Sequence, residues 1–188
     1  EEKMPIGRDL LYSTLLIHSD FKYKENEDDD SVYDIIAEME SFLEVLSEKT
    51  IERKSKEFIE KIRAKGGKFI NLIHQTARLY TNVEIGVGNF IGAYTVIGND
   101  AKIGDFNMIQ SYTVIGHDDI IGDWNRIDTH VTCVGGIVIE NHVDIHTAAV
   151  IGHHVVVESE ANVGACSFVI RRVKSGTTVF GNPARKLI

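Results

Sequence analysis

An apolar residue recurs at every sixth position from Leu79 to Val169 without a slip. A period of six fits neither the 3.6-residue α-helix nor the alternation of an isolated strand, but it fits a parallel β-helix, in which short strands stack around one apolar axis. We therefore predict that the repeated residues point inward and form the core. They are Leu79, Ile85, Ile91, Ile97, Ile103, Ile109, Ile115, Ile121, Ile127, Cys133, Ile139, Ile145, Ile151, Val157, Val163 and Val169.

The positions after each repeated residue favour turns. Glycine comes directly after it in half of the units, at Gly86, Gly92, Gly98, Gly104, Gly116, Gly122, Gly152 and Gly164. Of the next two positions in every unit, 17 of 32 are Gly, Asn, Asp, Ser or His, residues that tolerate tight or left-handed turns. The backbone is therefore predicted to turn once in each hexad.

The residues before the repeat predict a small α/β domain. A helix is expected from Thr50 to Ala64, because Phe58, Ile59 and Ile62 share one face and Gly66-Gly67 supplies a C-terminal cap. Shorter elements are expected as a helix that begins near Ser31, a strand over Phe42 to Leu46 and a strand over Phe69 to Ile73 that leads into the repeat. The prediction is thus a mainly β protein with an α/β domain at 1–73 and a β-helix domain with a C-terminal tail at 74–188.

Charge narrows the choice of partners. The chain carries 20 basic and 28 acidic residues, a formal charge of -8, which argues against nucleic acid and anionic membranes. No stretch approaches the roughly 20 apolar residues that span a bilayer, and the start lacks a signal-peptide pattern, so we expect a cytoplasmic protein. No acidic residue follows Glu160, whereas five basic residues do: Arg171, Arg172, Lys174, Arg185 and Lys186. They could bind a small polyphosphate or form a solvated tail, and charge alone leaves both open.

The two cysteines are expected to be reduced thiols. Cys133 occupies an inward position of the repeat, so a buried apolar role is favoured over a nucleophilic one. Cys166 falls at a predicted corner and could be exposed.

Three motifs add to the hexads: Asn71-Leu72-Ile73-His74, Gly116-His117-Asp118 and Gly181-Asn182-Pro183-Ala184-Arg185. With them the chain resembles, from about Thr50 onward, the NeuD/PglD group of left-handed β-helix sugar acetyltransferases. The resemblance implies a left-handed parallel β-helix with three hexads in each coil of about 18 residues. It also implies acetyl-CoA as the donor, a sugar or sugar nucleotide as the acceptor, and a homotrimer with active sites between neighbouring subunits.

The resemblance places the general base of the family at His117 and its supporting carboxylate at Asp118. Neutral imidazole near pH 7 can take a proton from an attacking hydroxyl or amine, and a carboxylate stabilises the imidazolium that forms. Gly135 matches a family glycine, and the missing side chain would let a backbone N–H approach the oxyanion.

Further contacts follow by position. The resemblance implies coenzyme A contacts at Gly135, Thr147 and Ala165. The chain has Gln110 where relatives place Asn and Arg126 where they place a histidine that contacts coenzyme A, and we retain both as site residues. From charge, we expect Arg171, Arg172 and Arg185 at the nucleotide phosphates. The glycine-rich strand-turn-helix with which relatives begin is absent, so we expect either a different acceptor or a shortened domain that binds the acceptor by other residues.

Two other functions remain open. His117 and His153 lie 36 residues apart, the spacing of the first pair of zinc ligands in γ-class carbonic anhydrases, but the third position is Glu158, so no metal is expected. The remaining histidines of the repeat are expected at surface corners: His130, His142, His146, His153 and His154. The array could also be a scaffold trimer without chemistry, against which the His117-Asp118 pair argues. The sequence thus favours an acetyl-CoA-dependent sugar O- or N-acetyltransferase.

Overall fold

The structure, a computed structural model, describes residues 48–187, with side chains from residue 56 onward. The chain divides into two compact units, residues 1–70 and 71–188. Helix α3 (Glu48–Ala64) confirms the expected helix and begins at Glu48 rather than Thr50. The N–H groups of Gly66 and Gly67 donate to the carbonyls of Arg63 and Ile62, which closes the predicted glycine cap. The elements expected near Ser31 and at Phe42 to Leu46 lie outside the described residues.

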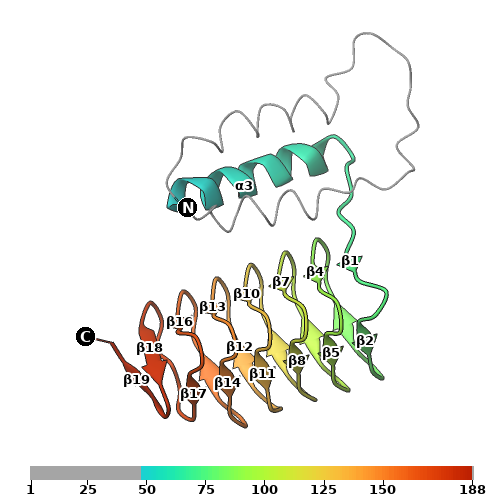
Figure 1. Cartoon of the computed structure of the whole chain (residues 1–188). Coiled ribbons are helices and arrows are strands. Elements are labelled where there is room, and N and C mark those ends of the chain that lie inside the picture. Colours follow the sequence, from blue (N-terminus) through green and yellow to red (C-terminus); the bar gives the residue numbers. More distant parts are fainter. Residues whose placement is uncertain (1–47, 188) are drawn as a thin grey trace. The chain divides into compact units, whose positions relative to one another are not determined.

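The second unit is a parallel β-helix of about six turns (Figure 1). Its strands form three sheets, here called A, B and C. Sheet A contains β1 (Leu72–Ile73), β4 (Phe90–Ile91), β7 (Met108–Ile109), β10 (Arg126–Ile127), β13 (Asp144–Ile145), β16 (Asn162–Val163), β18 (Thr178–Gly181) and β19 (Ala184–Lys186). Sheet B contains β2 (Arg78–Leu79), β5 (Val96–Ile97), β8 (Val114–Ile115), β11 (Thr132–Cys133), β14 (Val150–Ile151) and β17 (Phe168–Val169). Sheet C contains β3 (Glu84–Ile85), β6 (Lys102–Ile103), β9 (Ile120–Ile121), β12 (Val138–Ile139) and β15 (Val156–Val157).

The register follows the hexads. Parallel neighbours such as Ile97 and Ile115 lie 18 residues apart, so three hexads complete one coil and the expected left-handed β-helix is confirmed. Successive corners lie between sheets A and B, B and C, and C and A, and are named the AB, BC and CA corners. The chain ends in a hairpin of β18 and β19, whose turn holds the Asn182-Pro183 motif.

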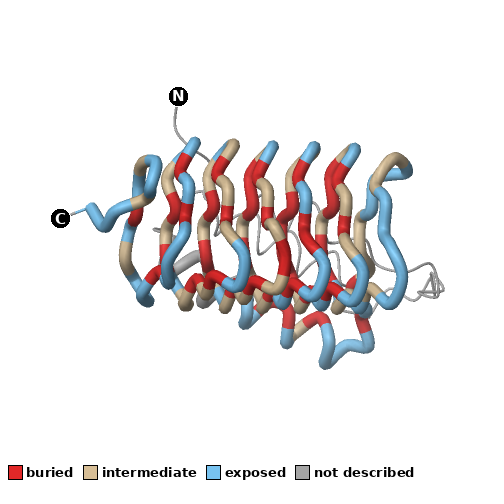
Figure 2. Tube along the Cα trace, turned by 90° about the horizontal axis from the view of Figure 1, so that it is seen from below, coloured by how far each residue is buried: buried red, intermediate tan, exposed pale blue. Residues whose placement is uncertain are grey.

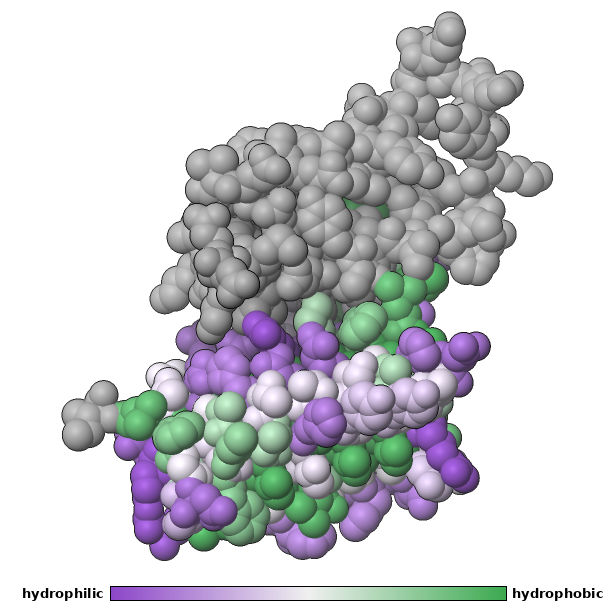
Figure 3. Space-filling model, viewed as in Figure 1, coloured by the Kyte–Doolittle hydropathy of each residue, from purple (hydrophilic) through white to green (hydrophobic). Residues whose placement is uncertain are grey.

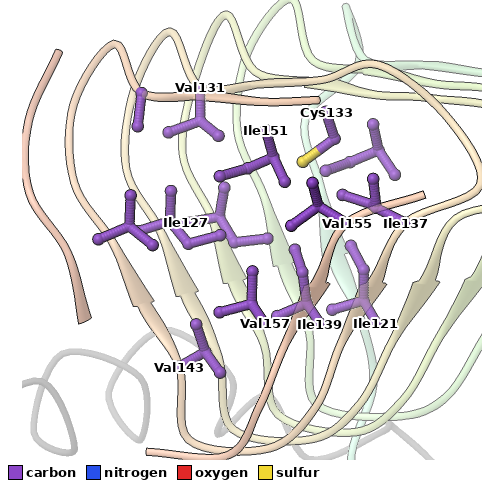
Figure 4. Close-up of a cluster of buried hydrophobic side chains, with 14 of the residues drawn as sticks. Ile121, Ile127, Val131, Cys133, Ile137, Ile139, Val143, Ile151, Val155 and Val157 are labelled. Atoms are coloured by element: carbon purple, nitrogen blue, oxygen red, sulfur yellow. The ribbon is translucent and has the colours of Figure 1, made fainter. Parts of the chain in front are cut away.

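The residues repeated every six positions point into the core, as predicted, except in the first coil. Every repeated residue from Ile91 to Val169 is buried. Figure 2 colours the buried residues of the chain red, and Figure 4 shows some of the repeated side chains, such as Ile121, Cys133 and Ile151, within one buried cluster. Leu79, however, is 37% exposed and Ile85 is only partly buried, because the first coil has a neighbouring coil on one side only. The strand expected over Phe69 to Ile73 is also shorter than predicted. Only Leu72–Ile73 is a strand, since its two residues pair with Phe90 and Ile91 of β4 and no other pairing extends it.

The corners confirm the predicted turns. One residue with a positive φ recurs at every sixth position from Asn82 to Cys166. Several of these residues are aromatic, which the sequence alone did not favour, because a left-handed conformation costs a residue with a Cβ about 1–2 kcal/mol. The aromatic rings stack on their equivalents one coil away: Tyr94 on Tyr112 at 5.1 Å and Phe106 on Trp124 at 4.8 Å between centroids. Such pairs contribute about 0.5–1.5 kcal/mol beyond burial, which offsets part of the strain.

Candidate functional site

His117 lies at the BC corner between β8 and β9. Because each coil repeats after 18 residues, two columns of residues line this corner. The first column contains Asn99, His117, Gly135 and His153, and the second contains Asp100, Asp118, Gly136 and His154. The β-helix therefore places His117, Asp118 and Gly135 together, as predicted.

His117 and Asp118 form a hydrogen-bonded pair. Nδ1 of His117 lies 2.7 Å from Oδ2 of Asp118, and both side chains are more than half exposed. The bond to Asp118 is the largest influence and raises the pKa of His117 above its usual value; desolvation lowers the pKa, and the charges of Asp118 and Asp119 raise it further. Since the bond to the carboxylate needs a proton on Nδ1, the neutral ring carries its lone pair on Nε2.

The next coil carries no side chain where the His117 ring lies. A Cβ on Gly135 would come 2.9 Å from Nε2 of His117, and the φ of Gly135 is +142°, a conformation for which glycine is needed. A Cβ on Gly136 would likewise lie 2.5 Å from Nδ1 of His154. The double glycine thus makes room for an imidazole from the coil on either side.

The Gly135 N–H is a donor without an acceptor in the described part of the chain. It makes no hydrogen bond within residues 48–187. At the CA corner, by contrast, the corresponding N–H of Asp105 donates to the side chain of Asp123 at 2.7 Å. An unpaired N–H beside Nε2 of His117 can stabilise negative charge on a reacting oxygen.

Asp119 is a buried carboxylate that sequence reasoning missed. It is 0% exposed, its Oδ2 accepts the Gly116 N–H at 2.7 Å, and its Oδ1 accepts the Ile137 N–H at 3.0 Å. Burial raises the pKa of Asp119, while the two backbone N–H groups lower it. The signal in the sequence was an acidic residue at a second inward position, four residues after Ile115.

Four of the other predicted site residues lie at or beside a different corner of the same chain. Gln110, Thr147 and Ala165 belong to the AB corner, and Arg126 precedes it on β10. Nε of Arg126 donates to Oδ1 of Asp128 at 2.7 Å. The structure therefore does not bring these residues to His117 within one chain.

The AB corner has its own polar and aromatic groups. Asp128 also meets Nδ1 of His146, 3.3 Å from Oδ2, and Tyr112 stacks between Tyr94 and His130. The guanidinium of Arg126 is thus held on a nearly buried carboxylate beside an exposed aromatic stack.

The basic residues separate into two groups. Arg171 and Arg172 follow β17 at the end of the BC corner, three coils from His117, or about 14 Å along the axis at the spacing of neighbouring strands. Arg172 and Lys174 both bond to Glu158, at 3.0 and 3.2 Å, and these bonds with that of Ser175 lower the pKa of Glu158 to about 2. Arg185 lies on β19 in sheet A, away from this group.

The surroundings of Glu158 and of the two cysteines bear on the zinc site and on a nucleophilic cysteine. Glu158 is occupied by its basic partners, and within the described part of the chain no three His, Cys, Asp or Glu residues gather as metal ligands. Cys133 is buried, and burial raises the pKa of its thiol, as its apolar assignment predicts. Cys166 is exposed at its corner. Among the described helices, none is both long and apolar enough to cross a membrane.

Comparison with known proteins gave structural relatives only. No protein-family model matches the chain, and no curated protein is significantly similar to it. PerB from Caulobacter crescentus, solved with CoA and GDP-perosamine, is 25% identical over 72% of this chain and 65% of its own, with a TM-score of 0.66. WeeI from Acinetobacter baumannii AYE is 31% identical over 70% of this chain and 65% of its own, with a TM-score of 0.67.

The acetyltransferase domain of PglB from Neisseria gonorrhoeae FA1090, in complex with acetyl coenzyme A, is 26% identical over 72% of this chain and 66% of its own, with a TM-score of 0.67. The chain spans less than two thirds of the length of each of these solved chains. It has the left-handed β-helix fold of the hexapeptide-repeat acyltransferases. Its structural neighbours confirm the resemblance that the sequence motifs indicated.

Proposed function

We propose that the protein is an acyltransferase that moves the acetyl group of acetyl-CoA to an amine or hydroxyl of a sugar or sugar nucleotide. His117 is the general base, Asp118 its supporting carboxylate and Gly135 the oxyanion donor. The observation that carries the proposal is the His117-Asp118 pair, whose ring lies over a glycine with a free N–H. The chain shares its fold with proteins that were solved with CoA or acetyl coenzyme A.

The chemistry is a direct transfer. The acceptor nitrogen or oxygen attacks the thioester carbonyl while Nε2 of His117 takes its proton, and the Gly135 N–H bonds to the oxyanion of the tetrahedral intermediate. The C–S bond then breaks, and the imidazolium returns the proton to the departing thiolate. Asp118 stabilises the imidazolium between the two steps.

The remaining predicted residues join this site if the protein is a trimer. Sheet B lies between the AB and BC corners, and its outward residues include Val96, Val114, Val150 and Phe168. Figure 3 shows apolar residues among hydrophilic ones on the face of the array in view. If three copies of the β-helix pack with sheet B facing a threefold axis, the BC corner of each copy meets the AB corner of its neighbour. Gln110, Arg126, Thr147 and Ala165 of one copy would then face His117 of the next.

The basic residues extend this groove. Arg171 and Arg172 lie at its C-terminal end, where we place the phosphates of coenzyme A, whereas Arg185 lies apart from them on β19 of sheet A. The acceptor is small, and neither nucleic acid nor membrane takes part. We place the reaction in the cytoplasm, which the two free thiols favour.

Replacement of His117 tests the proposal. His117→Ala should lower kcat for acetyl transfer by at least about a hundredfold, because a general base contributes on the order of 10² to 10⁴ in rate. The matched control is His142→Ala, which removes an imidazole from the CA corner, between β12 and β13. Release of CoA thiol with amino and hydroxy sugar nucleotides as acceptors gives the rate. Near-normal turnover in His117→Ala would overturn the proposed mechanism.

Thermal denaturation with acetyl-CoA separates an enzyme from a scaffold. Acetyl-CoA at 100 times its Kd should stabilise the wild type and the His117→Ala variant by about 2.7 kcal/mol. A melting temperature that acetyl-CoA leaves unchanged would favour the scaffold function.

A further inference from the structure

Asp119 occupies an inward position that is apolar in the neighbouring coils of its corner. Ala101 lies in the coil before it, and Ile137 and Val155 lie in the two coils after it, all buried. At the CA corner the same position carries asparagines. Asp119 is thus a carboxylate inside the core of the β-helix, and it directly follows the turn that carries His117 and Asp118.

Both oxygens of Asp119 bond to the backbone, and one bond replaces a bond of the β-helix ladder. In the preceding coil the Gly98 N–H donates to the Ile115 carbonyl at 2.9 Å. The equivalent Gly116 N–H donates instead to Oδ2 of Asp119 at 2.7 Å. The pairing of β8 with β11 accordingly joins only Val114 and Thr132, whereas the other pairs of sheet B join two residues each.

An asparagine at this inward position leaves the ladder intact. At the CA corner Asn107 accepts the Asn125 N–H at 2.9 Å and donates to the Gly122 carbonyl at 2.9 Å. The Gly104 N–H of the same turn still donates to the Ile121 carbonyl at 2.8 Å. The displaced bond of Gly116 therefore depends on a second acceptor oxygen, which a carboxylate has and an amide lacks.

The two backbone groups that Asp119 holds flank the proposed site. Gly116 directly precedes His117, and Ile137 directly follows the Gly135-Gly136 pair in the next coil. We propose that Asp119 is a positioning residue that sets the spacing between the His117 imidazole and the Gly135 N–H. This inference rests on the proposed acyl transfer, since that reaction needs the base and the oxyanion donor on the same reacting carbonyl.

The surroundings of Asp119 are consistent with this role. The ionisable groups that interact with it are His117 and Asp118 on its own turn and the buried thiol of Cys133 on β11. Its negative charge contributes to the raised pKa of His117. Removal of the charge without loss of shape should therefore lower the pKa of His117.

The test is Asp119→Asn, with Asp123→Asn as the matched control. Asp123 lies at the CA corner, where its Oδ1 accepts the Asp105 N–H, and Asn141 accepts the Asp123 N–H in the same way one coil later. Asp119→Asn should keep the melting temperature but lower kcat by about tenfold or more at a nearly unchanged KM for acetyl-CoA, because small misplacements of reacting groups cost that much. Asp123→Asn should change neither constant.

NMR supplies a readout that does not need turnover. In Asp119→Asn the Gly116 amide proton should move upfield and the pKa of His117 should fall, while Asp123→Asn leaves both unchanged. Wild-type resonances in Asp119→Asn would overturn the positioning role, and so would a wild-type kcat. If Asp119→Asn does not fold, Asp119→Ala is used instead, because alanine occupies the equivalent position in the preceding coil, at Ala101. The same changes are expected in this variant. A wild-type protein without acetyl transfer would refute the proposed function, and the NMR comparison would still decide whether Asp119 holds the turn.

Discussion

At the residue scale, the position of one proton decides what His117 can do. The bond from Nδ1 to Asp118 leaves the lone pair on Nε2, which faces Gly135 rather than solvent alone. The same bond raises the pKa of His117, so more of the imidazole is protonated and inactive as a base when the pH falls. Asp118 thus makes the base stronger and moves its working range to higher pH.

Asp118→Asn should expose this effect in the pH profile of acetyl transfer. The variant loses the main cause of the raised pKa, so the acidic limb of kcat/KM, where His117 becomes protonated, should shift to lower pH. At high pH the rate should fall by about tenfold or more, because the imidazolium lacks its carboxylate partner. Initial rates between pH 5 and 9 measure both effects. An acidic limb at the wild-type pH would show that Asp118 does not set the pKa of the base.

At the element scale, buried asparagines hold the CA corner. The side chain of Asn107 bonds to Asn89 and Gly122 and accepts the Asn125 N–H. The side chain of Asn125 accepts the Val143 N–H at 2.8 Å, but its Nδ2 has no partner within the described part of the chain. The ladder therefore ends at Asn125, because the next inward residue, Val143, cannot accept a hydrogen bond.

This difference predicts unequal effects of the same truncation. Asn107→Ala should lower the free energy of unfolding by about 1–2 kcal/mol more than Asn125→Ala, since it leaves more buried backbone groups unpaired. Both variants remove the same atoms, so the transfer and cavity contributions largely cancel. Urea denaturation followed by circular dichroism measures the difference. Equal midpoints and slopes would show that the ladder bonds contribute nothing specific.

At the scale of the whole molecule, one chain does not contain every predicted site residue at one corner. His117 and Gly135 lie at the BC corner, whereas Gln110 and Arg126 lie at or beside the AB corner. The proposed trimer unites them across the groove between two copies. This arrangement makes the site depend on assembly, which mixed variants can test.

Mixed trimers should recover activity that neither parent has. The His117→Ala variant keeps an unmodified AB corner, and a Gln110→Ala/Arg126→Ala double variant keeps an unmodified BC corner. If the two chains assemble at random, about a quarter of the grooves combine both sound corners. At low acetyl-CoA, co-expressed chains should therefore reach about a quarter of the wild-type rate. Activity no higher than that of the parents would contradict a site shared between copies.

The hexad pattern determined the architecture in advance. Because an inward residue every six positions can be buried only if the chain turns once per hexad, the core and the corner positions of the histidines followed from the spacing, whereas three hexads per coil was what the family resemblance implied. The resemblance to the family, and not the spacing, identified His117, Asp118 and Gly135 as candidate site residues. The predictions of an inward Leu79 and of a strand over the whole of Phe69 to Ile73 were wrong, because a periodic pattern does not show where the stacking of coils ends.

Only the tertiary structure decided which groups meet in space. The carboxylate of Asp119 displaces a ladder bond, and the Gly135 N–H has no acceptor within residues 48–187; a linear pattern encodes neither feature. Tyr94 and Tyr112, which have left-handed backbones, are stabilised at their corners because their rings stack on each other across one coil. Sequence spacing sets the repeat of a stacked backbone, whereas hydrogen-bond partners depend on the three-dimensional placement of each polar atom.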